Sequence, residues 1–155
     1  VDTIFLIITA MLFGGTMEST GMLPSIAAAI LRLVRGAASL VAGTIATCLV
    51  FNLTASEQYL AIVVPGRMFR KAYADFGLRQ RNLSRALEDG GTVTSVLVPW
   101  NTCGAYAASV LGVATFNYAP YAFFNILCPI VAIALASAGI GVLRVAQTAA
   151  TDTGA

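Results

Sequence analysis

The sequence predicts an all-α integral membrane fold: a helical bundle with a re-entrant hairpin and a discontinuous transmembrane helix, forming one part of a larger protein. Composition is the first reason, because 58% of the 155 residues are hydrophobic and only 10% are charged, whereas soluble domains carry about a quarter charged residues. The second reason is that short runs of amides, hydroxyls, Pro and Gly interrupt the apolar stretches. Lipid tolerates an unwound backbone only where protein buries it or where it lines a cavity.

The N-terminal segment is apolar but interrupted. Residues 3–13 and 22–31 are apolar, and the polar run between them contains Glu18. One long broken helix and two short helices fit this pattern equally well. The opening has neither an initiator Met nor a basic flank, so it does not read as a signal peptide.

Charge placement predicts a re-entrant hairpin over residues 37–64. Arg32 and Arg35 precede this stretch, and six basic residues occupy the polar segment 65–89, which is expected to be a cytoplasmic loop. Basic residues favour the cytoplasmic side, so the stretch begins and ends on one side. Its roughly 28 residues are too few for two spans of about 20 residues each. We therefore expect a hairpin with its tip at residues 52–58, closed at Pro65 and Gly66; the inverted orientation stays open.

The next segments predict a broken span and a final span. Residues 91–98 and 104–113 are two short helical pieces on either side of Pro-Trp-Asn-Thr. Residues 116–120 resemble a turn with interfacial aromatics, and residues 121–143 a span ending at Arg144. The domain prediction is a transmembrane domain over residues 1–146 and a disordered polar tail over residues 147–155.

The two breaks predict a site for a transported cation. A broken helix exposes carbonyls at the end of one half and amides at the start of the next, and transporters keep their binding sites at such breaks. Neutral oxygens of the kind that a hard cation such as sodium accepts come from Asn52, Thr54, Ser56, Asn101 and Thr102. The two Asn residues are favoured as sodium ligands, whereas each hydroxyl is more often a packing device in a membrane helix.

Proton coupling needs a titratable group, and the chain has no His. A carboxylate at membrane depth costs about 2.5 to 3.5 kcal/mol on insertion scales and so indicates function; Glu18, Glu57 and Asp89 are the candidates. For Glu18 and Glu57, a water-facing turn is an equal alternative. Glu88 and Arg85 are expected at the cytoplasmic mouth, where Glu88 and Asp89 would cap the first half-helix at its positive end.

Other functions find little support. A nucleophilic Cys103 would lack a His base, and the three cysteines have neither disulfide nor zinc spacing. We therefore expect no enzyme activity and no cofactor. The net charge of +2 gives no indication of nucleic-acid binding, and none is expected.

Three motifs resemble the carboxy-terminal portion of the NhaC-type sodium/proton antiporters. They are QYLAIVVPGRMF at 58–69, NLSRALEDGGTVTS at 82–95 and PWNTCG at 99–104. The resemblance covers about residues 14–142, with mild departures at Gly91, where Ser is expected, and Val96, where Pro is expected. It implies a multi-pass protein of a bacterial or archaeal inner membrane, with paired hairpins and broken helices, and it adds Thr92 and Thr94 to the site candidates. The wider ion transporter superfamily also contains exchangers of organic acids.

The resulting hypothesis is sodium/proton exchange by alternating access, with the site between the hairpin tip and the broken span. Its partners would be the sodium ion and the proton, the lipid bilayer and the remaining part of the same transporter, and assembly into a homo-oligomer is compatible with it. Two alternatives stay open: an organic-acid exchanger of the lactate or malate type, and a helical membrane subunit that transports nothing itself.

Overall fold

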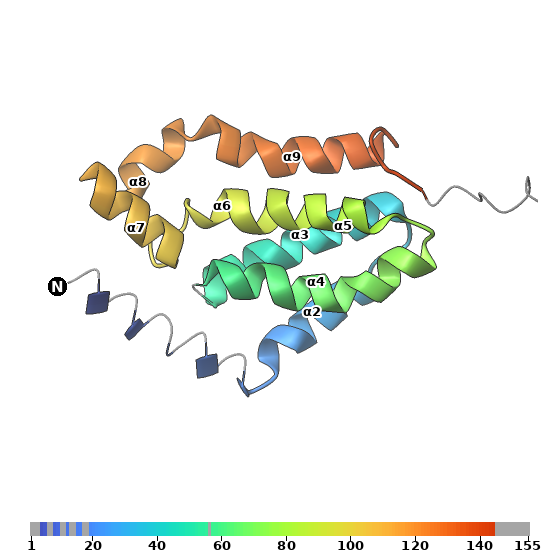
Figure 1. The fold of residues 1–155 in the computed structure, drawn as a ribbon, viewed down its shortest axis with the longest axis horizontal. Coiled ribbons are helices and arrows are strands. Elements are labelled where there is room, and N and C mark those ends of the chain that lie inside the picture. Colours follow the sequence, from blue (N-terminus) through green and yellow to red (C-terminus); the bar gives the residue numbers. More distant parts are fainter. Residues whose placement is uncertain are drawn as a thin grey trace, which may run out of the picture.

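The computed structural model describes residues 19–55 and 57–144, together with a few positions before Ser19, and the regular structure of this part is helical (Figure 1). The expected all-α fold is confirmed: the described part has one isolated antiparallel bridge, between Leu78 and Arg144, and no longer strand. Glu18, Ser56 and the expected tail 147–155 lie outside the described residues. The elements are α2 Met22–Arg32, α3 Ala37–Thr54, α4 Gln58–Asp75, α5 Gln80–Leu87, η1 Glu88–Thr92, α6 Val93–Ser95, α7 Thr102–Leu111, α8 Thr115–Tyr118, η2 Ala119–Tyr121 and α9 Phe123–Ser137.

Helices α3 and α4 form the expected hairpin, but α4 does not close at Pro65 and Gly66 as predicted. It continues to Asp75. Packing overrides the local signal: Phe69 and Tyr73 lie one turn apart and are fully buried, and Gly66 lies so close to α5 that an added Cβ would be 3.1 Å from the Leu87 side chain. Each helix has 18 residues, or about 27 Å at 1.5 Å per residue.

The basic segment, residues 65–89, is mostly helical, so the expectation that it forms a loop is wrong. Its basic residues lie on the second half of α4, on α5 and, as Arg79, in the short turn between them, where Gly77 has a φ of 65°. Because α3 and α4 are antiparallel, the α4–α5 turn lies at the same end of the bundle as the start of α3, and the end of α9 lies there too (Figure 1). The basic residues of these segments therefore gather at one end.

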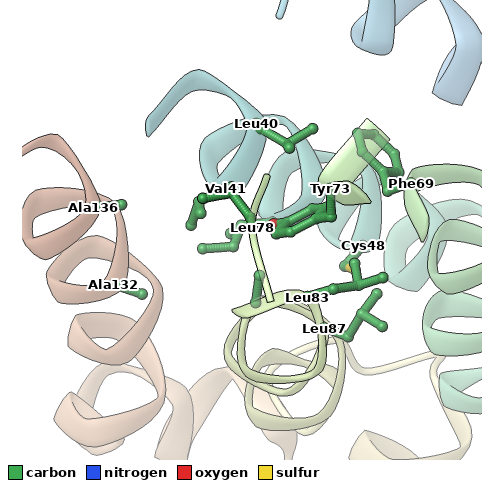
Figure 2. Close-up of a cluster of buried hydrophobic side chains, with 12 residues drawn as sticks. Leu40, Val41, Cys48, Phe69, Tyr73, Leu78, Leu83, Leu87, Ala132 and Ala136 are labelled. Atoms are coloured by element: carbon green, nitrogen blue, oxygen red, sulfur yellow. The ribbon is translucent and has the colours of Figure 1, made fainter. Parts of the chain in front are cut away.

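Helix α3 occupies the centre of the bundle. Its side chains Leu40, Val41 and Cys48 pack against α4, α5 and α9 (Figure 2). Gly90 of η1 approaches α3 so closely that an added Cβ would lie 2.8 Å from Ile45 Cα. This backbone contact sets the distance between the hairpin and the broken span.

The discontinuous helix has its break where the sequence predicts it, but the first half is longer. Helix α5, the π-helix η1 and α6 form one rod from Gln80 to Ser95, and α7 begins at Thr102 after the break. Glu88 and Asp89 therefore lie inside a helix, so the expectation that they cap its start is wrong. Residues 116–120 are helical rather than a turn, and α8–η2 meets α9 at an angle of 55°.

Among the described residues, α3 is the one unbroken helix that is long and apolar enough to cross a membrane, and the bent α8–η2 and α9 pair qualifies if it counts as one span. The final helix, Phe123–Ser137, is shorter than the predicted span. The re-entrant path of the hairpin stays a prediction.

We expect Gly90→Ala to destabilise the protein by about 1 to 3 kcal/mol, because overpacking at a backbone contact forces helices apart. The measurement is the thermal unfolding midpoint of the complete detergent-purified protein. Gly36→Ala is the matched control, since Gly36 is extended and an added Cβ there meets nothing within 4 Å. Equal midpoints for the two variants would contradict the close approach of η1 to α3.

Candidate cation site at the helix break

The structure brings Asn52 and Asn101 together, although 49 positions separate them in the chain. Asn52 lies near the end of α3 and Asn101 at the end of the break, and both side chains are fully buried. The Asn101 amide Nδ2 donates to Asn52 Oδ1 at 3.3 Å. Hairpin tip and broken span thus meet through two neutral amides.

The other contacts of these amides fix which way each one faces. Asn52 Nδ2 donates to the Gly91 carbonyl at 2.8 Å, to Thr94 Oγ1 at 3.1 Å and, at 3.5 Å, to the Gly90 carbonyl. Because a carbonyl only accepts, Asn52 must present its nitrogen to η1 and its oxygen to Asn101. Asn101 Oδ1 accepts from the Cys103 backbone N–H at 3.0 Å, which leaves the Asn101 nitrogen for Asn52.

The π-helix supplies the acceptors for Asn52. Its wider turn moves carbonyls out of the α-helical register, and such segments are frequent at functional sites. Two consecutive glycines, Gly90 and Gly91, make this segment narrow: an added Cβ on Gly91 would lie 3.0 Å from the Ile62 side chain. These carbonyls are not among the candidates predicted from the sequence; the Gly-Gly pair between two helical pieces was the signal that could have identified them.

Around the break, further side chains join the hairpin tip to α7. Asn101 is the N-cap of α7, and the next residue, Thr102, donates through its hydroxyl to Glu57 Oε1 at 3.1 Å. The Trp100 indole N–H donates to the Leu53 carbonyl at 2.8 Å. That carbonyl belongs to the last turn of α3, where helix carbonyls lack intrahelical partners. Trp100 therefore holds the hairpin tip against the break, a role not identified from the sequence.

The acidic candidates fall at two places. Glu57, half-buried, is at the break with Thr102. Asp89 lies on η1 and faces α9: its carboxylate is 3.8 Å from Arg85 Nε and accepts from the Cys128 thiol at 3.1 Å. Glu88 is exposed and, with Arg85, lines an open cavity of about 520 Å³ towards the basic end. The structure therefore separates Glu57 from Asp89 and places Arg85 with both acids of η1.

Two candidates do not join the amide pair. The Thr54 hydroxyl donates to its own helix at the Val50 carbonyl, at 2.6 Å, which is the packing role that membrane hydroxyls commonly have. Thr92 contributes its carbonyl to Ser95. Thr94, by contrast, lies directly against Asn52 and donates to the Gly90 carbonyl at 2.6 Å.

The donor set suits a transported hard cation better than a resident metal. Amide, carbonyl and hydroxyl oxygens are ligands that such a cation accepts, whereas the described residues contain no cluster of three His, Cys, Asp or Glu side chains that could hold a metal. In the described part, every buried polar side-chain atom has a partner. A cation between the amides therefore requires Asn101 to turn its nitrogen away.

Comparison with known proteins gives consistent matches. A sequence profile of the Na+/H+ antiporter family matches residues 1–140. The Na+/H+ antiporter NhaC of Bacillus subtilis is 37% identical over 131 residues, which are 84% of this chain and 29% of that protein. The arginine/ornithine antiporter ArcD of Halobacterium salinarum is 37% identical over 136 residues, 88% of this chain and 28% of that protein. The malate-2H+/Na+-lactate antiporter of Bacillus subtilis is 32% identical over 124 residues, 80% of this chain and 26% of that protein.

The chain thus spans less than a third of the length of these relatives. All three are named as antiporters, and none as an enzyme. No solved structure matches the chain.

Trp100→Phe keeps an aromatic ring but removes the N–H that caps α3, so the hairpin tip should separate from the break more often. We expect faster amide hydrogen exchange at residues 53–55 and a loss of about 0.5 to 1.5 kcal/mol of stability, the usual net value of one hydrogen bond. Ser109→Ala is the control, because the exposed Ser109 hydroxyl bonds only within its own helix. Exchange at the tip as slow as in the unaltered protein would contradict this role for Trp100.

Proposed function

Because the chain belongs to the Na+/H+ antiporter family, we propose that it is the part of a membrane transporter that holds the cation during sodium/proton exchange by alternating access. Family membership agrees with the resemblance carried by the sequence motifs and makes the chain part of a membrane protein. The observation that carries the proposal is the contact between the buried amides of Asn52 and Asn101 at a helix break. Discontinuous helices hold ions near the membrane midplane in many transporters.

The depth of the break supports a midplane site. From Arg85, at the basic end, the rod continues to Ser95, a rise of at most about 15 Å over ten residues, since the π-helical residues rise less than those of an α-helix. That is half of a hydrocarbon core about 30 Å thick. If the basic end is cytoplasmic, the break lies near the middle of an inner membrane that the complete transporter crosses several times.

The same geometry supports a re-entrant hairpin. The tip of α3 and α4 contacts the break through Trp100 and Thr102, so tip and break lie at one depth. Helix α7 continues beyond them, while α3 and α4 both return to the basic end. Arg67 is the basic residue of α4 nearest the tip, and nine residues, or about 14 Å, separate it from Gln58. With Arg67 at the membrane surface, the hairpin reaches only the midplane and its polar tip lies in protein rather than in lipid.

Glu57 is the proposed proton carrier at this depth, with Asp89 as a second one nearer the cytoplasm. A cation beside a carboxylate favours its charged form, whereas burial favours the protonated form. A proton on Glu57 and a cation at the neighbouring amides would therefore oppose each other, and this opposition is what exchange requires.

Asn101→Ala should abolish most sodium-dependent proton flux in vesicles containing the complete transporter, by about tenfold or more, because it removes a ligand and the cap of α7. A lost N-cap alone costs about 0.5 to 2 kcal/mol, so Asn101→Ser, which caps the helix with a shorter side chain, separates folding from ligation. We expect Asn101→Ser to restore the stability due to the cap, though not that due to the bond to Asn52, and not to restore flux. Flux near the unaltered level in Asn101→Ser would remove Asn101 from the site.

The runner-up function is exchange of a small organic acid such as lactate or malate. The relatives named for malate and lactate and for arginine and ornithine favour it, since both have cargo with a carboxylate, and the amide N–H groups at the start of α7 could face such a group. Uptake of labelled malate or lactate by the same vesicles, without sodium-dependent proton flux, would select this function over cation exchange.

The third hypothesis, a helical membrane subunit that transports nothing itself, predicts a different result for Glu57→Gln. In that case Glu57→Gln, which keeps an acceptor for Thr102, would leave flux unchanged. For an exchanger we expect Glu57→Gln to reduce proton-coupled flux by about tenfold or more, since an amide cannot carry the proton, while thermal stability changes little. Flux assays and unfolding midpoints on one preparation distinguish the two.

A further inference from the structure

The π-helix η1 contacts the Asn52–Asn101 pair on one side and, through Asp89, Cys128 of α9 on the other. On the α3 side, its Gly91 carbonyl accepts from Asn52 at 2.8 Å. On the α9 side, its Asp89 carboxylate accepts from Cys128 and lies 3.8 Å from Arg85. Asp89 is thus two residues away along the chain from the carbonyl that Asn52 holds.

The cavity beside Asp89 leaves room for its side chain to move when η1 moves. A cavity of about 270 Å³ lies between η1 and α9 and is lined by Arg85, Asp89 and Cys128, together with apolar side chains of α9. Neither α3 nor α9 carries a charged residue. On the α9 side of η1, the charged groups beside Asp89 and Cys128 are those of the rod itself, Arg85 and Glu88, and a shift of η1 changes the contacts of Asp89 directly.

Asn52 cannot keep all its contacts when a cation is bound. Its Oδ1 is the atom that a cation would take, and this oxygen now accepts from Asn101 at 3.3 Å. A cation replaces that N–H donor by a charge, which draws the Asn52 oxygen towards it. Because oxygen and nitrogen share one rigid amide plane, the Nδ2 contacts to Gly91 and Thr94 change with it.

We propose that η1 couples the two sites: cation binding at the Asn52–Asn101 pair draws the Asn52 amide from the η1 carbonyls and moves Asp89 away from Cys128. This inference rests on the proposed cation exchange and adds the path by which occupancy of one site reaches the other. A π-helical segment is a rare local departure from the α-helix that is frequent at functional sites, and packed elements pass between discrete arrangements rather than deforming gradually. Loss of one contact that holds the segment can therefore change its arrangement.

Cys128 provides a direct reporter. The thiolate is the reactive form of a cysteine, and a neighbouring carboxylate opposes it, so the thiol should react faster once Asp89 has moved. We expect sodium to accelerate alkylation of Cys128 by N-ethylmaleimide by about fivefold or more relative to choline, within the usual range of coupling between sites. The rate is measured by mass spectrometry of the Cys128 peptide from the complete transporter, normalised to a cysteine-free peptide of the same digest.

Asn52→Asp tests the coupling apart from the binding. At alkaline pH, where the assays are run, the ionised carboxylate keeps an oxygen for the cation and for Asn101 but cannot donate to the Gly91 carbonyl. We expect this variant to bind radioactive sodium at equilibrium, to exchange it for protons at least about tenfold more slowly, and to alkylate at Cys128 at one fast rate with or without sodium. Asn125→Ala is the matched control: it removes an amide bond to the Val93 carbonyl from the α9 side and should keep the sodium response.

The outcomes separate this inference from the proposed function. Sodium-dependent proton flux with a Cys128 rate that is unchanged or slower in sodium overturns the coupling through η1 and leaves cation exchange standing. A sodium response that persists in Asn52→Asp also overturns it. Absence of any sodium binding or flux in the unaltered transporter overturns both.

Discussion

The buried amide of Asn52 is the interaction on which the rest of the structure depends. It joins three segments: its own helix α3, the π-helix η1 through the Gly91 carbonyl, and the break through Asn101. A buried amide without partners costs about 1 to 3 kcal/mol by protein mutational data. If one of these segments moves alone, the Asn52 amide loses a partner and the protein loses stability of that order. The hairpin, the π-helix and the break therefore form one unit, although each looks like an isolated irregularity in the sequence.

The glycines make this unit possible. Gly90 and Gly91 allow α3 and α4 to approach the rod so closely that any side chain would collide with Ile45 or Ile62. At Gly104 the constraint is stronger still, because an added Cβ would overlap the Val98 carbonyl across the break. Close backbone approach is the usual way in which membrane helices pack, since lipid offers no hydrophobic drive for their association. Close approach thus lets the short side chains of Asn52 and Thr94 bond directly to the backbone carbonyls of Gly90 and Gly91.

The sequence predicted the parts of the fold that local chemistry determines. The helical class and the break before Thr102 followed from lipid's intolerance of unpaired backbone groups. The shared Asn and hydroxyl composition suggested that Asn52 and Asn101 lie together, and they do, although Asn52 lies in the last turn of α3 rather than at a break. Prediction from the sequence failed where tertiary packing decides: Pro65 did not end α4, because buried Phe69 and Tyr73 continue the helix, and Glu88 and Asp89 lie within a rod rather than at its start. The π-helix was not predicted because a change from α to π leaves no periodicity signal over five residues.

The separation of Glu57 from Asp89 bears on how one fold could serve relatives with different cargo. The amide pair offers only neutral groups, and a neutral site sets no preference by net charge; an amide can face a cation with its oxygen or a carboxylate with its nitrogen. In the proposed exchanger, charge selection would then come from the acids that flank the pair, Glu57 at the tip and Asp89 on η1. Because Arg85 offsets Asp89, Glu57 is the acid whose charge the amide pair senses most directly. A change of cargo within this family would thus require changes around Glu57 before any change in the amides themselves.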